Sequence, residues 1–224
     1  MMINYIALDT ETGGLDPFRN PLLQVGCYAP DGNILNIRII PPVHLTITEQ
    51  AKKVNGYPES HKGYPVYDES YAMEQLKTFM DQYKPKWILC HNAVFDIPFI
   101  REANNRTNKK VYIPKALCTM SFAMAMQYCG GFSQPNFTLD SLIKEFAPNY
   151  VRPPTHDAAE DAKATHMVFQ GMLERFDGLV KLANNNAMDG LKQIEHNQSG
   201  NVNTNEARSQ KSFVQGSRWG RSGR

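Results

Sequence analysis

The sequence predicts an α/β fold in which a mixed sheet, opening with three antiparallel strands, is flanked by helices. Two observations predict it. Strand-like apolar runs joined by short turn signals fill residues 3–40, and beyond them helical patterns alternate with a short apolar strand. The chain has 224 residues, of which 42% are hydrophobic, so it can bury one good core.

Three strands are expected at the start of the chain. Residues 3–8 and 22–29 are apolar runs, and residues 33–40 return after the Asp31-Gly32 pair, a strong hairpin signal. Strands that follow one another through tight turns pair antiparallel. The first part of the sheet is therefore predicted to be an antiparallel meander.

Helices dominate the pattern that follows. Residues 70–83 carry apolar side chains at helical spacing, and the run KWILCH at residues 86–91 has the composition of a short buried strand. Helices after a meander that cross to further strands indicate a mixed sheet covered by helices. Four more helices are expected, at residues 97–104, 121–128, 138–146 and 157–175.

The chain changes character after residue 183. Residues 184–224 are rich in Asn, Gln, Ser, Gly and Arg, and they hold six basic residues against three acidic ones. Such a segment has too few apolar residues to form a core. The prediction is a folded domain at residues 1–183 and a polar, basic, largely disordered tail at residues 184–224.

Cysteine usage and hydropathy bear on the compartment. The four cysteines form no close CxxC pair, which disfavours both disulfides and a zinc site. No apolar run approaches the ~20 residues that a membrane helix needs. We therefore expect a soluble, intracellular, cytoplasmic protein in a reducing environment, with no membrane partner.

Two acids close the first strand. Asp9 and Glu11 are two residues apart, so their side chains point to the same face if the strand extends that far. Two carboxylates this close repel each other, and a divalent cation removes the conflict. Oxygen ligands in a partly hydrated site suit Mg²⁺ or Mn²⁺. The alternative for this motif taken alone is a solvated turn at a strand end.

Two later motifs supply further acids. In HNAVFD, residues 91–96, Asp96 follows the second apolar strand, where it or Asn92 could cap the next helix and Pro98 would fall in the first turn. In THDAAED, residues 155–161, Asp157 and Glu160 have the spacing of a capping box. His156 stands just outside that helix and Asp161 lies one turn into it. Each motif alone is explained by helix-start chemistry.

The three motifs in this order resemble those of the DEDD superfamily of 3′–5′ exonucleases. A DxE pair ends the first strand, HNxxFD follows a later strand, and a histidine stands five residues before Asp161 at the start of a late helix. That histidine spacing is typical of the superfamily's histidine branch, which includes the proofreading subunit of bacterial replicative polymerases. The resemblance covers about residues 3–175.

The resemblance implies a fold, a chemistry and a set of site residues. Family members have the ribonuclease-H-like fold, with a mixed five-stranded sheet, and hydrolyse phosphodiester bonds from the 3′ end with two divalent ions, Mg²⁺ or Mn²⁺. By motif, His156 would be the general base. The implied metal ligands are Asp9, Glu11, Asp96 and Asp161, and the implied substrate contacts are Thr10, Thr12, Gly14, Leu15, Phe95 and His156.

Three functions remain open at this level. The first is a 3′–5′ exonuclease on single-stranded DNA that releases nucleoside monophosphates, either free-standing or in proofreading. The second is an exoribonuclease or oligoribonuclease, because no motif separates ribose from deoxyribose. The third is a non-catalytic module that binds nucleic-acid ends or a polymerase. The basic tail could hold single strands, dock a polymerase or another replication protein, or have no function.

Overall fold

The computed structural model describes residues 4–130, 132, 136–153, 156–178 and 180–181. The chain divides into two compact units, Met1–Glu174 and Arg175–Arg224, and the sheet lies in the first. The predicted boundary at residue 183 and the predicted tail fall outside the described residues. None of the described helices is long and apolar enough to span a bilayer.

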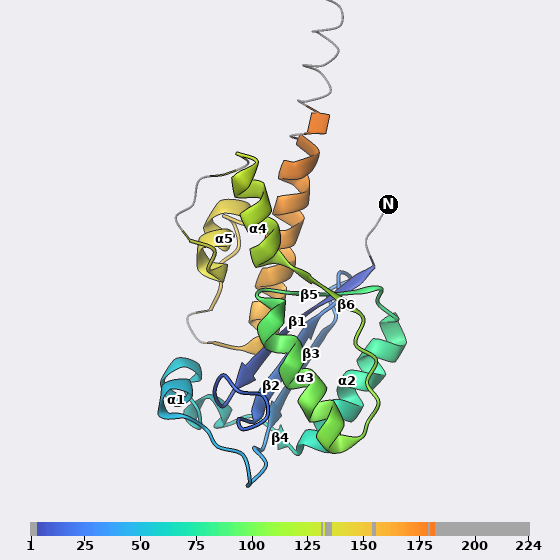
Figure 1. The fold of residues 1–224 in the computed structure, drawn as a ribbon, viewed down its shortest axis with the longest axis vertical. Coiled ribbons are helices and arrows are strands. Elements are labelled where there is room, and N and C mark those ends of the chain that lie inside the picture. Colours follow the sequence, from blue (N-terminus) through green and yellow to red (C-terminus); the bar gives the residue numbers. More distant parts are fainter. Residues whose placement is uncertain (1–3, 131, 133–135, 154–155, 179, 182–224) are drawn as a thin grey trace, which may run out of the picture. The chain divides into compact units, whose positions relative to one another are not determined.

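A mixed sheet forms the centre of the first unit, in the order β4-β3-β2-β1-β5-β6 (Figure 1). The first three strands are antiparallel, as predicted, whereas β5, β6 and β4 join by parallel pairing. The sheet has one strand more than the predicted five, and its edge strand β4 is only two residues long. The bounds are β1 Tyr5–Thr12, β2 Leu22–Tyr28, β3 Ile34–Ile39, β4 Val66–Tyr67, β5 Trp87–Cys90 and β6 Lys115–Cys118.

Helices cover both faces of the sheet. Their bounds are α1 Glu49–Asn55, α2 Glu69–Tyr83, α3 Ala93–Thr107, α4 Thr119–Tyr128 and α5 Leu139–Phe146, with a 3₁₀ turn at Glu59–His61. A last helix starts at residue 158 and continues to the end of the first unit. Side chains of Thr48, Asp68 and Thr138 cap α1, α2 and α5, which explains where these helices begin.

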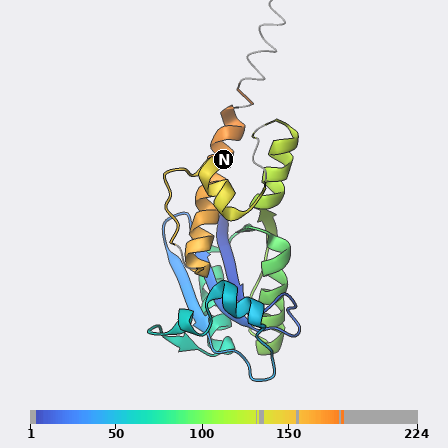
Figure 2. The ribbon, with the colours of Figure 1, turned by 90° about the vertical axis from the view of Figure 1, so that its left-hand side faces the viewer.

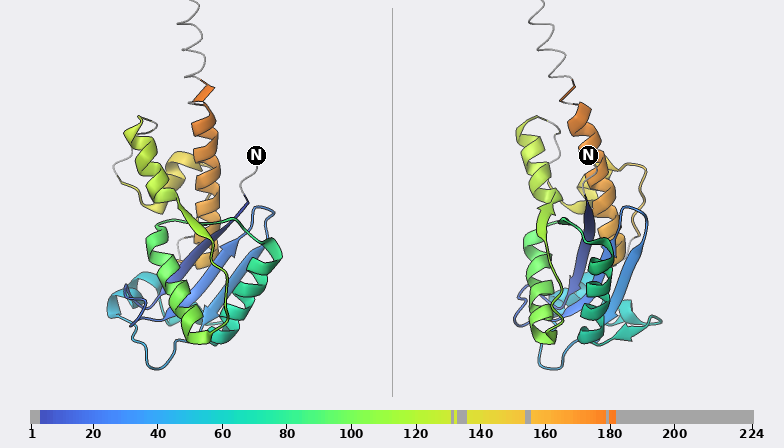
Figure 3. Two further views of the ribbon diagram at one scale, coloured as in Figure 1. Left: turned by 45° about the vertical axis from the view of Figure 1, so that its right-hand side comes forward. Right: turned by 90° about the vertical axis from the view of Figure 1, so that its right-hand side faces the viewer.

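The side chains of β1 alternate between two cores. Ile6 and Leu8 pack in the cluster formed with α2 and α3, whereas Tyr5 and Ala7 pack in a second cluster with residues of the last helix. The helices accordingly lie on opposite faces of the sheet (Figure 3). Since side chains alternate along a strand, the odd-numbered positions that follow also point toward the last helix.

Helix α3 begins four residues earlier than predicted. Asn92 adopts a left-handed conformation with φ 67°, and the helix starts at Ala93 directly after it. Pro98 therefore lies in the second turn, and the prediction that it occupies the first turn is wrong. A proline there cannot donate a hydrogen bond to the carbonyl of Val94, an exposed residue next to the helix start.

The last helix approaches β2 very closely at Gly26. A Cβ atom built on Gly26 would lie 2.2 Å from the carbonyl carbon of Ala158 and from the amide nitrogen of Ala159. Both atoms belong to backbone, so the contact can be relieved only by moving the helix. Gly26 also pairs with Asp9 in the sheet, so this contact sets the distance between the first and the last acidic motif.

We expect Gly26→Ala to destabilise the protein by about 1–3 kcal/mol or more, because overpacking against backbone forces the helix away from the sheet. Thermal denaturation measures the loss. Gly178→Ala is the matched control, since no atom lies within 4 Å of the added methyl position. Equal melting temperatures of Gly26→Ala and the parent would contradict the close packing.

Candidate active site

Strand β1 carries the first two acids. It continues to Thr12, and Asp9 and Glu11 still pair with Gly26 and Gln24 of β2; the register shifts only after Glu11. The first strand therefore extends far enough to include both acids, as the sequence argument required. Both carboxylates project from the same face, toward the last helix.

Asp96 reaches the end of the same strand from α3. Its side chain is buried, with 2% exposed, and its Oδ1 accepts hydrogen bonds from the Thr10 amide at 3.1 Å and the Thr10 hydroxyl at 2.8 Å. Asp96 is thus not the helix cap. Asn92 occupies the cap position without a side-chain hydrogen bond. The other oxygen of Asp96, Oδ2, is buried and has no hydrogen-bond partner.

Asp161, on the last helix, and His156, two residues before its start, complete the group. One ligand atom each of Glu11, His156 and Asp161 lie within 4.8 Å of one another. Asp161 is buried, and both of its oxygens accept hydrogen bonds from Arg152, from Nε and from the terminal Nη2, each at 2.5 Å. The imidazole Nδ1 of His156 lies 3.7 Å from Asp161.

The start of the last helix is fixed by Asp157. Its Oδ1 accepts from the amides of Ala159 and Glu160, so it is the predicted cap. Glu160 does not complete the capping box, because its carboxylate accepts instead from the Tyr150 hydroxyl at 3.0 Å. Asp157 also accepts from Gln24, Asn36 and Arg38, which tie it to β2 and β3. These bonds hold the segment that carries His156 against the sheet.

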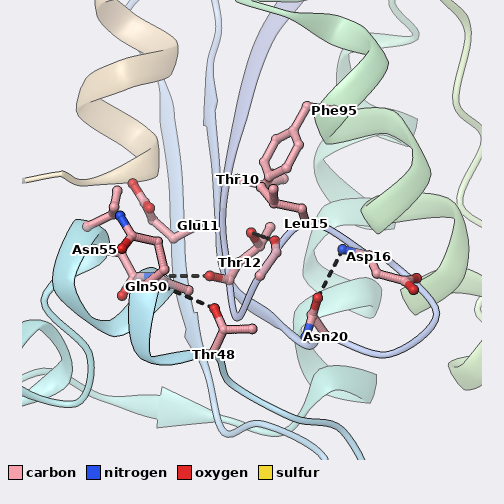
Figure 4. Close-up of a pocket in the computed structure, with 13 residues that line it drawn as sticks. Thr10, Glu11, Thr12, Leu15, Asp16, Asn20, Thr48, Gln50, Asn55 and Phe95 are labelled. Carbon is pink, nitrogen blue, oxygen red and sulfur yellow. Dashed lines mark hydrogen bonds between the residues drawn. The ribbon is translucent and has the colours of Figure 1, made fainter.

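A pocket of about 600 Å³ opens beside Glu11. Figure 4 shows Phe95 of α3 and Asn55 of α1 on opposite sides of the strand end that carries Glu11 and Thr12. Five of the predicted substrate contacts line this pocket: Thr10, Thr12, Gly14, Leu15 and Phe95. The sixth, His156, lines a neighbouring pocket of about 800 Å³ that shares Val54 and Asn55 with the first.

The chain matches a known protein family over most of its length. The family model RNase_T, described as Exonuclease, matches residues 6–169. The chain belongs to this exonuclease family. The matched range contains every predicted site residue, and the predicted resemblance to the DEDD exonucleases is confirmed.

The relatives of this chain include bacterial DNA polymerases. DNA polymerase III PolC-type proteins are 27% identical over 177 residues in Caldanaerobacter subterraneus subsp. tengcongensis and 24% identical over 185 residues in Thermotoga petrophila. The matches cover 76% and 80% of this chain but only 12% and 13% of those proteins. The chain thus spans about an eighth of the length of these relatives.

Solved structures show the same fold. The zinc-bound form of the E. coli exonuclease I complex with single-stranded DNA aligns with a TM-score of 0.66 at 19% identity, over 80% of this chain and 43% of that one. Its complex with a dA16 oligonucleotide aligns with a TM-score of 0.63 at 18% identity, again over 80% of this chain and 43% of that one. The likeness supports the predicted ribonuclease-H-like architecture.

Several residues at the site were not predicted. Arg152 contacts both Asp161 and His156, and Gln50, Val54 and Asn55 of α1 line the pocket. Helix α1 carried no signal because its seven residues are too few to show a period. It lies beside the loop after β1 (Figure 2), where the Asn55 amide side chain donates to the Thr12 carbonyl at 2.8 Å.

Asp9, Glu11 and Asp96 hold their protons more strongly than ordinary carboxyl groups. Burial raises the pKa of Glu11 from 4.5 to about 7 and that of Asp96 from 3.8 to about 7. Burial, with the charges of Asp96, Asp161 and Glu11, raises the pKa of Asp9 well above 3.8. The carboxylate of Asp161, 3.7 Å from Nδ1, raises the pKa of His156. The site therefore disfavours its own negative charge when no cation is bound.

We expect the metal-free protein to lose stability as the pH rises from 3.8 to about 7, the ordinary and raised pKa of Asp96. In this interval the folded protein binds more protons than the unfolded chain, so deprotonation favours unfolding. Asp96→Asn removes the titrating carboxyl group, and with it this pH dependence, and keeps an oxygen that accepts hydrogen bonds from Thr10. Its stability relative to the parent should therefore increase across the interval, measured by denaturant unfolding in a chelator. A constant difference would contradict the raised pKa.

Proposed function

We propose that this protein is a metal-dependent 3′–5′ exonuclease that removes nucleoside monophosphates from single-stranded DNA ends. The observation that carries the proposal is the convergence of Glu11, His156 and Asp161 within 4.8 Å beside a pocket in a chain of the exonuclease family. Asp9 and Asp96 supply further acids at the same strand end. The proposed catalytic set is Asp9, Glu11, Asp96, His156 and Asp161, and the presence of His156 supports the proposal that the chain belongs to the histidine branch.

Divalent cations fit this donor set. The buried, unpartnered Oδ2 of Asp96 and the raised pKa values of Asp9 and Glu11 indicate carboxylates that lack a compensating charge. Exonucleases of this family use divalent metal ions. We propose two ions, Mg²⁺ or Mn²⁺, held by Asp9, Glu11, Asp96 and Asp161, because these ions prefer oxygen ligands. When bound, they stabilise the negative charge that develops on the phosphodiester and the leaving oxygen.

His156 is the proposed general base. Its side chain is 45% exposed, so the attacking water can reach the imidazole, and Asp161 lies 3.7 Å from Nδ1. A nearby carboxylate stabilises the imidazolium that forms when the ring accepts the proton. Thr10 has a positioning role instead: its hydroxyl and amide both donate to Asp96 and hold that carboxylate at the strand end.

The pocket beside Glu11 is the proposed site of the 3′-terminal nucleotide. The side chain of Leu15 is 84% exposed at its mouth, and the Phe95 ring forms part of the same wall. Apolar and aromatic faces of this kind pack on nucleobases without selecting among them. The Thr12 hydroxyl donates to the Gly14 carbonyl at 2.7 Å, and both residues line the pocket.

Hydrolysis of end-labelled substrates tests the proposed function. Single-stranded DNA, double-stranded DNA and RNA are compared side by side with Mg²⁺ or Mn²⁺, and the products are resolved by size. We expect mononucleotides to appear from the 3′ end of single-stranded DNA first. Faster hydrolysis of RNA would favour the oligoribonuclease alternative, and binding without hydrolysis would favour the non-catalytic one.

The cellular setting is also a proposal. Similarity to PolC-type polymerases supports a role in proofreading, or as a free-standing nuclease that acts on the same ends. All four cysteines are free, which suits a reducing compartment such as the cytoplasm. Residues 184–224 are proposed as a tail that contacts nucleic acid, a polymerase or another replication protein.

Truncation after residue 183 should leave turnover of a trinucleotide unchanged, because all proposed site residues lie upstream. On long single strands at low salt the truncated protein should bind more weakly. The difference should fade as salt rises, since basic residues act mainly through counterion release. Filter binding across a salt series measures this. Equal affinity at every salt concentration would leave partner docking or no role for the tail.

A further inference from the structure

Arg152 occupies the part of the site where the proposed function requires a cation. Its Nε and Nη2 donate to the two oxygens of Asp161, and Nη2 lies 3.3 Å from Nδ1 of His156. Its side chain is only 14% exposed. The guanidinium of Arg152 therefore compensates the charge of Asp161.

We propose that Arg152 and a divalent cation compete for Asp161, so that Arg152 must give up at least one carboxylate oxygen when the cation binds. The inference rests on the proposed function, because it takes Asp161 as a metal ligand. It assigns to Arg152 a positioning role: it stabilises the empty acidic site and sets the affinity of that site for metal.

Charge and geometry both support competition. A bidentate arginine uses the donors of a planar fork on both oxygens of one carboxylate, which leaves only the outer lone pairs of Asp161 for another ligand. A guanidinium beside a divalent ion adds a repulsion that falls slowly with distance in a partly buried site. Both effects weaken cation binding as long as Arg152 stays in place.

Arg152 also has a second anionic partner. Its Nη1 donates to Asp140 of α5 at 2.8 Å, and the side chain of Asp140 is 67% exposed. The guanidinium can therefore release Asp161 and remain paired near the site. Without this contact, release would leave a partly buried charge uncompensated, which is costly.

A role of Arg152 in orienting Asp161 would change the metal affinity in the opposite direction. If Arg152 only oriented Asp161 for the cation, its removal would misplace the ligand and weaken metal binding. If Arg152 competes with the cation, its removal should strengthen metal binding. The affinity for Mn²⁺ therefore separates the two roles without any measurement of hydrolysis.

The test is calorimetric titration of Mn²⁺ into the parent, Arg152→Gln and Lys163→Gln. Lys163 lies on the same helix as Asp161, and its Nζ is 5.7 Å from the Tyr150 ring. Each of the two glutamine variants loses one positive charge, so Lys163→Gln is the control for the change in net charge. We expect Arg152→Gln to bind Mn²⁺ about tenfold more tightly, and Lys163→Gln to change the affinity about twofold or less. Arg152→Lys keeps the charge but loses the planar fork on Asp161, so its affinity for Mn²⁺ should lie between those of the parent and Arg152→Gln.

Stability gives a second readout. Without metal, Arg152→Gln should melt at a lower temperature than the parent, and saturating Mn²⁺ should raise its melting temperature by more than it raises that of the parent. Where the metal-free variant is too unstable to titrate, transfer of Mn²⁺ from the loaded protein to a chelator of known affinity yields the same constant.

The outcomes separate the two proposals. If the parent binds Mn²⁺ and hydrolyses DNA but Arg152→Gln binds Mn²⁺ equally or more weakly, the competition is wrong and the proposed function stands. Equal tightening in Arg152→Gln and Lys163→Gln also overturns the competition, because the effect is then one of net charge. If neither the parent nor Arg152→Gln binds Mn²⁺, the metal site itself is wrong, and the inference with it.

Discussion

Replacing Asp9 with alanine is expected to reduce hydrolysis of 3′ ends by about three orders of magnitude or more, because loss of a central ligand removes the several kcal/mol that bound cations supply to the transition state. The same change should leave the metal-free protein at least as stable as the parent. Burial and the negative charges of Asp96, Asp161 and Glu11 raise the pKa of Asp9, so its removal relieves repulsion.

Release of labelled mononucleotides and melting in a chelator measure these two effects. Asp81→Asn is the control, since Asp81 is an exposed acid on α2 that pairs with Lys77. Asp161→Ala should also abolish hydrolysis, but it leaves the guanidinium of Arg152 with fewer partners and should lower stability. Turnover by Asp9→Ala at the parental rate would overturn the site assignment.

Replacing His156 with alanine should lower the catalytic rate by about two to four orders of magnitude, the usual effect of losing a general base. Binding of single-stranded DNA should change little, because the pocket beside Glu11 is lined by other residues. The rate of the parent should rise with pH as the imidazole loses its proton and then reach a plateau. The rate of the variant should not show this rise with pH.

Single-turnover rates across a pH series, with DNA affinity measured in parallel, test this role. His44→Ala is the control, because His44 is exposed and outside both pockets. A His156→Ala rate close to that of the parent at pH 7 would show that His156 is only a residue of the segment before the last helix.

Local signals predicted most of the fold. The hairpin signal at Asp31-Gly32 and the apolar runs beside it predicted three antiparallel strands. The bounds of β2 and β3 differ from the prediction by one residue at most, whereas β1 continues four residues further, to Thr12. Amphipathic patterns likewise located α2 and α5. Such elements bury one regular face, so their period is visible in the sequence.

Short elements that depend on distant partners were missed. Helix α1 has seven residues and is held by the loop after β1, where the Thr48 amide donates to the Gly13 carbonyl at 2.7 Å. Strand β6 has four residues, none of them buried, and exists because it pairs with β5. Neither element is long enough for a hydrophobic period to identify it.

For the site, the sequence alone predicted which acids and which histidine belong together, because their motifs follow in a recognisable order. It could not establish how each is held. The burial of Asp96 against Thr10, the pairing of Asp161 with Arg152 and the approach of the last helix to Gly26 join residues far apart in the chain or on different elements. Hydrogen bonds, ion pairs and steric contact act through space, so these features arise only when the sheet and its helices pack together.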